Sequence, residues 1–185
     1  MLYVSRNYKL AERCLELAAK LIEFFKDDEE AKYSFNWSAL VYMRYAESCY
    51  RNGHKDKAAA AAKRGLEFLS SGKKSLEQHL DYPAQRPRRL SEVAKLYFFM
   101  GERDKAYELI DQMSRCGLCS DNNGERYGLC SDCHERKCYE VYLTLAKFAE
   151  LEDNYKLALD YYKKAHDITA DDSEVEIAIE VLSRK

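Results

Sequence analysis

The sequence predicts an all-α fold, and three observations lead to this prediction. Glycine and proline, which interrupt helices, number only 7 and 2 among 185 residues. Apolar residues make up 46% of the chain and recur along most of it with the spacing of a helix face. Segments with the same apolar pattern also repeat, as they do in stacked helical arrays. A chain of this length supplies one sizeable core, so we expect a single helical domain over residues 1–185.

Four segments share one pattern of small and apolar residues. Each has an alanine, namely Ala11, Ala58, Ala106 or Ala158, followed by apolar or small residues four and seven positions later. This spacing places the three side chains on one stripe of a helix. The pattern predicts helices over residues 5–25, 55–69, 103–115 and 154–167.

A second helix precedes three of these alanines. Its small residue lies 12 positions earlier, at Ala46, Ala94 and Ala146. Turn-forming residues at 52–53, at 101 and at 153–154 separate the two helices. The sequence therefore predicts αα-hairpins, whose first helices cover residues 35–51, 88–100 and 137–151.

Two further helices complete the prediction. A short one is expected around residues 74–80, and another over residues 171–184. The latter segment begins with acidic and serine capping residues and places its apolar residues on one face. These apolar residues are Val175, Ala178, Ile179 and Leu182. We expect 171–184 to cover the apolar face of the last hairpin, as terminal elements of repeat arrays do.

The hairpins resemble those of tetratricopeptide-repeat (TPR) proteins, which place small and bulky residues at these positions. The resemblance covers residues 39–65, 87–113 and 139–165, with a lone second helix at 8–18. It implies a TPR-like α-solenoid. The four alanines are 47, 48 and 52 residues apart, whereas the family repeats every ~34 residues. Extra residues are therefore expected between hairpins, which leaves open both a regular superhelix and a looser bundle.

Five of the seven cysteines lie within residues 116–138, and their spacing predicts a zinc site. Cys116 and Cys119 form one Cys-x2-Cys pair, and Cys130 and Cys133 form the other. Each pair sets two thiolates about one edge of a tetrahedron apart, which suits Zn²⁺. Because four thiolates leave no position for water or substrate, we expect a structural zinc in a turn-rich insertion between two hairpins.

Other ligands and other chemistries remain open for this segment. His134 and Cys138 are alternative fourth ligands in place of Cys133. Paired cysteines also form disulfides, redox pairs and iron–sulfur clusters. The two cysteines outside the segment, Cys14 and Cys49, lie in helix-like apolar patterns and are expected to be small buried core residues.

Charge and hydropathy bear on partners and location. Lysine and arginine total 30 against 32 aspartate and glutamate, so the net charge of −2 gives no general attraction to nucleic acid. Residues 1–20 lack the apolar region of a signal peptide, and no run approaches the ~20 apolar residues that span a bilayer. We expect a cytoplasmic protein, in which reduced cysteines bind metal.

The one compact basic run is Arg86-Pro87-Arg88-Arg89, placed just before a predicted helix. Together with the cysteine segment it supports an alternative function, a nucleic-acid-binding or regulatory zinc protein. Zinc held by four thiolates adds negative charge, which disfavours phosphate binding there. A thiol-based redox sensor is the other alternative.

The resemblance to TPR proteins also implies a concave binding groove lined by fixed positions of each first helix. Here those positions are Leu40, Met43, Glu47, Tyr50, Arg88, Ser91, Lys95, Phe98, Glu140, Leu143, Lys147 and Glu150. Family members that clamp chaperone carboxylates carry Lys and Asn where this chain has Met43 and Glu47, so that ligand class is not expected. The mixed apolar and charged lining suits a helix or an extended peptide.

Catalysis is not indicated by the sequence. It contains no phosphate-binding glycine loop and no nucleophile motif, and its four histidines are scattered. We therefore expect a protein–protein interaction adaptor rather than an enzyme, with a protein or peptide partner and a structural Zn²⁺.

Overall fold

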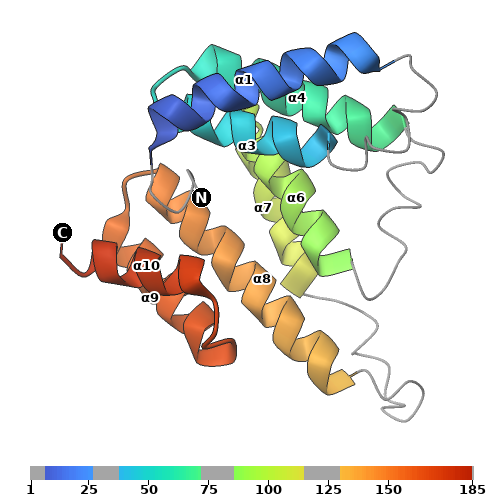
Figure 1. Cartoon of the computed structure of the whole chain (residues 1–185). Coiled ribbons are helices and arrows are strands. Elements are labelled where there is room, and N and C mark those ends of the chain that lie inside the picture. Colours follow the sequence, from blue (N-terminus) through green and yellow to red (C-terminus); the bar gives the residue numbers. More distant parts are fainter. Residues whose placement is uncertain (1–6, 27–37, 72–85, 115–129, 185) are drawn as a thin grey trace. The chain divides into compact units, whose positions relative to one another are not determined.

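The structure is a computed structural model that describes residues 7–26, 38–71, 86–114 and 130–184. Within these ranges every regular element is an α-helix and there is no strand (Figure 1). The helices are α1 (Tyr8–Phe25), α3 (Ser38–Arg51), α4 (Lys55–Ser71), α6 (Arg86–Phe99), α7 (Arg103–Ser114), α8 (Cys130–Leu151), α9 (Tyr155–Ile168) and α10 (Ser173–Leu182). The all-α prediction is confirmed, and the short helix expected at 74–80 lies outside the described residues.

The helices fall into two compact units. The first holds α1, α3, α4, the greater part of α6 and the start of α7. The second holds the start of α6, the rest of α7, and α8, α9 and α10. The boundary between the two units falls within α6 and again within α7. The expectation that residues 1–185 form a single domain stays a prediction.

The alanines that define the three hairpins are deeply buried. The six repeat alanines are completely buried: Ala46, Ala58, Ala94, Ala106, Ala146 and Ala158. A small side chain at these positions lets two helix backbones approach closely, which a larger side chain would prevent. The consecutive pairs α3 with α4 and α8 with α9 pack against each other.

The same turn joins the two helices of each hairpin. After α3, the N–H of Gly53 donates to the carbonyl of Tyr50 (3.0 Å) and the N–H of His54 to that of Cys49 (2.9 Å). Gly53 has φ +82°, so this is a Schellman motif, in which a left-handed residue closes the helix.

The other two hairpins repeat this geometry. Gly101 (φ +83°) and Asp153 (φ +59°) occupy the left-handed position, and the residues after them donate to the carbonyls of Tyr97 and Ala149. In each case the residue after the turn accepts the first bond of the next helix from the repeat alanine, as His54 does from Ala58 (3.0 Å). The repeat seen in the sequence is therefore also a repeat of backbone hydrogen bonds.

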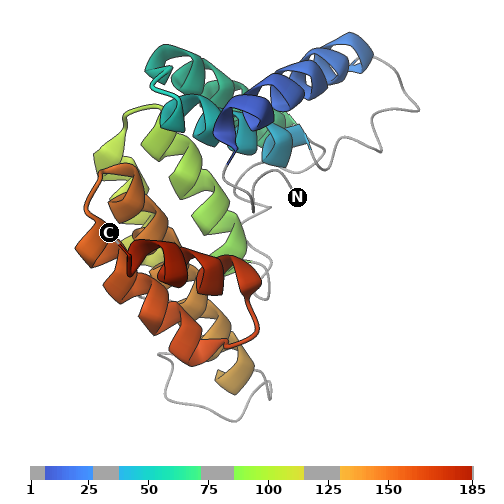
Figure 2. The same ribbon diagram turned by 60° about the vertical axis from the view of Figure 1, so that its left-hand side comes forward.

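In the first unit, α1 lies against the α3–α4 hairpin (Figures 1 and 2). Its N-terminus is built like that of α9, because the side chain and carbonyl of Asn7 accept from Leu10 and Ala11. Ala11 and Ala19 are buried in this contact. Near the end of α1, Glu23 accepts hydrogen bonds from Arg64 Nε of α4 (2.5 Å) and from the Tyr42 hydroxyl of α3 (2.7 Å).

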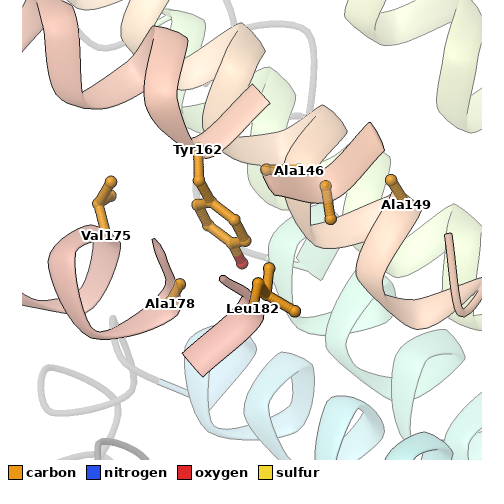
Figure 3. Close-up of a cluster of buried hydrophobic side chains, with 7 residues drawn as sticks. Ala146, Ala149, Tyr162, Val175, Ala178 and Leu182 are labelled. Atoms are coloured by element: carbon orange, nitrogen blue, oxygen red, sulfur yellow. The ribbon is translucent and has the colours of Figure 1, made fainter. Parts of the chain in front are cut away.

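In the second unit, the core lies between α8, α9 and α10. Figure 3 shows the Tyr162 ring pointing between the alanines of α8 and the apolar side of α10. The core residues contributed by α10 are Val175, Ala178 and Leu182, with Ile179 partly buried beside them. The helix predicted at 171–184 is thus present as α10, and it packs against α9.

Polar contacts also hold α10 in place. The Asp172 side chain caps the helix by accepting from the N–H groups of Glu174 and Val175 and accepts a further bond from the Tyr139 hydroxyl of α8. Lys147, a buried residue of α8, donates to Glu174 (2.8 Å). A buried ammonium is costly unless it is paired, so this contact fixes the start of α10 against α8.

Candidate functional site

The structure corrects the backbone expected for the second half of the cysteine segment. The first helix of the last hairpin begins at Cys130 rather than at Lys137. Cys130 and Cys133 therefore lie on helix α8 and not in a turn-rich loop, and His134 and Cys138 follow them on the same helix. Cys116 and Cys119 lie outside the residues that the structure describes.

Helix geometry brings two of the predicted zinc ligands to one face. Cys130 and Cys133 are three positions apart, and His134 is four positions from Cys130. Residues with these spacings are neighbours on a helix surface. Among the described residues, no group of three or more His, Cys, Asp and Glu side chains is arranged to hold a metal. Of the four predicted zinc ligands, Cys130 and Cys133 therefore lie on one helix.

The two remaining cysteines differ from each other. Cys49 is completely buried, and burial raises the pKa of its thiol to about 12, as expected for a core residue. Cys14 is exposed on α1, so the expectation that it belongs to the core is wrong. The apolar pattern around Cys14 arises from a second face of α1, which the α3–α4 hairpin does not cover.

The residues predicted to line the groove are largely enclosed by the chain itself. Six of them are buried: Met43, Glu47, Ser91, Phe98, Lys147 and Glu150. Five are partly buried: Leu40, Tyr50, Lys95, Glu140 and Leu143. Only Arg88 is exposed.

Several of the buried lining residues make contacts within the chain. Glu47 pairs with Arg51 (3.2 Å) on α3. The Arg103 guanidinium lies 3.4 Å from the centroid of the Phe98 ring and donates to the Phe98 carbonyl (2.7 Å). The Ser91 hydroxyl lies 2.8 Å from that of Thr144. These side chains contribute to the packing within each unit, so they are less exposed than the family pattern implies.

The basic run also differs from its predicted setting. The predicted helix begins at Arg88, whereas α6 begins at Arg86, so the whole run forms the first turn of the helix. Proline fits the first turn of a helix because the first N–H groups have no partner within the helix. Arg88 is exposed and Arg89 is partly buried.

Comparison with known proteins gives no relative. The chain matches no model of a known protein family, no curated protein and no solved structure. None of the helices that the structure describes is both long and apolar enough to cross a bilayer.

Two features were missed by the sequence interpretation. One is a polar cluster where Glu12 of α1 accepts from Asn52 Nδ2 (2.5 Å) and lies 2.9 Å from His54 Nδ1. Burial of Glu12 raises the pKa of its carboxyl group, but the hydrogen bonds from Asn52 and His54 outweigh burial and hold this pKa below its usual value. The other is the exposed apolar face of α1. Its signal is present in the sequence as a regular spacing that differs from that of the repeat alanines.

Proposed function

We propose that this protein is a TPR-like interaction adaptor whose cysteine segment, residues 116–138, is held by a structural Zn²⁺. The observation that carries the proposal is the threefold recurrence of one hairpin, with the same turn and the same buried alanines. Stacked hairpins of this kind build extended surfaces, which suit protein partners.

The start of α8 supports the zinc assignment. Cys130 and Cys133 occupy the first turn, and neighbouring positions of a helix set two ligands at a separation that one metal ion can bridge. A helix N-terminus favours negative charge, and thiolate is the form in which cysteine binds zinc. With Cys116 and Cys119 as the second pair, the metal ties the segment before α8 to the helix itself.

We propose that the partner binds to those predicted lining residues that remain partly exposed. In the first unit these include Tyr50 and Lys95, and in the second Glu140 and Leu143. Each pair combines an aromatic or apolar side chain with a charged one, a composition that suits a helical or extended peptide.

The metal is tested by elemental analysis of the purified protein with a thermal melt before and after chelation. We expect about one zinc per chain and a fall in Tm of about 5 °C or more on chelation, because metal binding contributes to folding. Cys133→Ser is expected to lose the metal, whereas Cys14→Ser, which changes an exposed cysteine of α1, is the matched control and keeps it.

Two further variants identify the fourth ligand. His134→Ala and Cys138→Ser retain the metal if Cys133 is the ligand, and whichever of them loses it replaces Cys133. Protein without zinc, or a melt that chelation leaves unchanged, would contradict the structural zinc site.

The adaptor role is tested separately, by affinity capture followed by mass spectrometry. The double variant Tyr50→Ala/Leu143→Ala removes one partly exposed contact from each unit while leaving the fully buried alanines in place. We expect the native protein to capture a partner that the double variant does not. Equal capture by both would show that these residues do not bind the partner.

A further inference from the structure

Most of the large apolar side chains that are exposed in the described part of the chain lie on α1. Leu17, Leu21 and Phe24 are 62%, 60% and 79% exposed, and Leu10 and Phe25 are also exposed. A cluster of this kind on a water-exposed helix marks an interaction site more often than single exposed residues do.

The spacing of these residues is that of a coiled-coil seam. Leu10, Cys14, Leu17, Leu21 and Phe24 follow one another at alternating steps of four and three residues. All five are exposed. This is the a and d pattern of a heptad repeat, which packs against another helix by knobs-into-holes contacts. We call these five residues the α1 seam.

The opposite side of α1 is already occupied. Ala11 and Ala19 are buried against α3, and Glu12 and Glu23 bond to residues of the α3–α4 hairpin. Helix α1 is therefore held firmly from one side while its seam faces outward. A preformed helix loses little conformational freedom when it binds, which favours affinity.

The charge beside the seam is positive. Arg13 and Lys20 lie at the positions next to it, and both are exposed. Lys20 pairs with Glu16 (3.2 Å) in an exposed i,i+4 contact, which is weak. The acidic residues Glu12 and Glu23 face the α3–α4 hairpin instead, as their hydrogen bonds show. The border that a partner helix would meet is basic.

We propose that the α1 seam binds an amphipathic helix of a partner protein, whose apolar stripe is bordered by acidic residues. The inference rests on the proposed adaptor function and names a surface and a partner chemistry for it. A second copy of α1 is a poorer occupant, because an antiparallel pair would bring Arg13 and Lys20 against the same basic border. Acidic residues beside the partner's stripe would pair with Arg13 and Lys20 and fix its orientation.

The test uses two synthetic helical peptides about three heptads long, with leucine at a and d. One carries glutamate at e and g, and the other carries lysine. Fluorescence anisotropy is expected to show binding of the glutamate peptide at least about tenfold tighter than that of the lysine peptide at low salt. The difference should shrink at high salt, because exposed charges are screened.

Substitutions locate the binding on α1. Leu17→Gln/Leu21→Gln should abolish binding without unfolding the protein, since both side chains are exposed. Leu157→Gln, which changes an exposed leucine of α9, is the matched control and should bind like the native protein. Arg13→Glu/Lys20→Glu should reverse the preference in favour of the lysine peptide.

Three results would overturn the inference. The first is equal affinity of the native protein for the two peptides. The second is peptide binding that persists in Leu17→Gln/Leu21→Gln. The third is a dimer of the native protein in sedimentation equilibrium that becomes a monomer in Leu17→Gln/Leu21→Gln. The last would assign the seam to a second copy. The variant Tyr50→Ala/Leu143→Ala, which tests the groove contacts, should still bind the glutamate peptide. The experiment therefore distinguishes a failure of the proposed groove contacts from a failure of the α1 seam.

Discussion

At the scale of single residues, the left-handed positions of the three turns set how each first helix ends. Gly53 and Gly101 adopt positive φ without cost, because glycine has no Cβ. Asp153 adopts φ +59° in the third turn and bears the strain of a side chain in that region. A Cβ added at Gly53 or Gly101 meets no atom within 4 Å, so its cost arises in the backbone alone.

We predict opposite effects at the equivalent positions. Asp153→Gly should raise the free energy of unfolding by about 0.5–1 kcal/mol, since it relieves the left-handed strain. Gly53→Ala and Gly101→Ala should each lower it by about 1–2 kcal/mol. Urea melts measure the three values, and Asp153→Asn is the control, because asparagine tolerates this conformation. A destabilised Asp153→Gly would show that the aspartate stabilises the turn by another contact, such as its bond from the Tyr155 hydroxyl.

A second prediction at this scale concerns pH. Hydrogen bonds from Arg64, and then from Tyr42, lower the pKa of Glu23 to about 2 against a usual 4.5. A carboxylate whose pKa is lower in the folded than in the unfolded protein stabilises the fold fully at a pH above the unfolded-state pKa. This stabilisation is lost as the pH falls through the folded-state pKa. Glu23 should therefore stabilise the protein fully at pH 7 and lose that contribution between about pH 4.5 and pH 2.

Glu23→Gln tests this prediction. The variant should be less stable than the native protein at pH 7, and the difference should shrink as the pH is lowered toward 2 in denaturant melts. Glu16→Gln changes an exposed i,i+4 pair of the same helix and should alter stability by at most about 0.5 kcal/mol. A difference between native protein and Glu23→Gln that does not vary with pH would exclude the linkage.

At the scale of elements, Gly65 shows how closely α4 packs. A Cβ at this position would lie 3.0 Å from Leu96 Cδ2 of α6 and 3.1 Å from Tyr42 Cβ of α3. Glycine is unfavourable inside a helix by about 1 kcal/mol relative to alanine. Glycine is therefore favoured at this position of α4 because the neighbouring helices leave little room for a side chain, and not because it suits a helix.

We predict that Gly65→Ala lowers the free energy of unfolding by about 1–2 kcal/mol, since overpacking outweighs the gain in helix propensity. Gly65→Val should cost more. Lys63→Ala, at an exposed position of α4, should stay within about 0.5 kcal/mol of the native protein. Stabilisation by Gly65→Ala would mean that α4 has room to move away from its neighbours.

The start of α8 shows where element prediction failed. Residues 130–137 read Cys-Ser-Asp-Cys-His-Glu-Arg-Lys, which contains no glycine or proline. The cysteine spacing suggested a loop, but nothing in the local composition ends a helix there. Ligand spacing of three residues is compatible with both a tight turn and a helix, so the motif alone did not decide between them.

At the scale of the whole molecule, the hairpins were predictable because their signal is local. Ala46 and Ala58 lie 12 residues apart on the two helices of one hairpin, and this spacing along the sequence is enough to identify them. The burial of the residues predicted to line a groove was not predictable, because whether Met43 or Lys147 is buried depends on which other helices cover it. The same reason explains why Cys14 was wrongly predicted to be buried. Its apolar neighbours indicate an apolar helix face, but they do not indicate whether another helix covers that face.

The recurring turn also bears on how the chain folds. The two buried repeat alanines of each hairpin are only 12 residues apart in the sequence, and the turn between them is closed by its own hydrogen bonds. Contacts between residues close in sequence require little loop closure, and proteins rich in them reach the native state quickly. Each hairpin can thus serve as an independent starting point for folding, whatever the length of chain that joins it to the next.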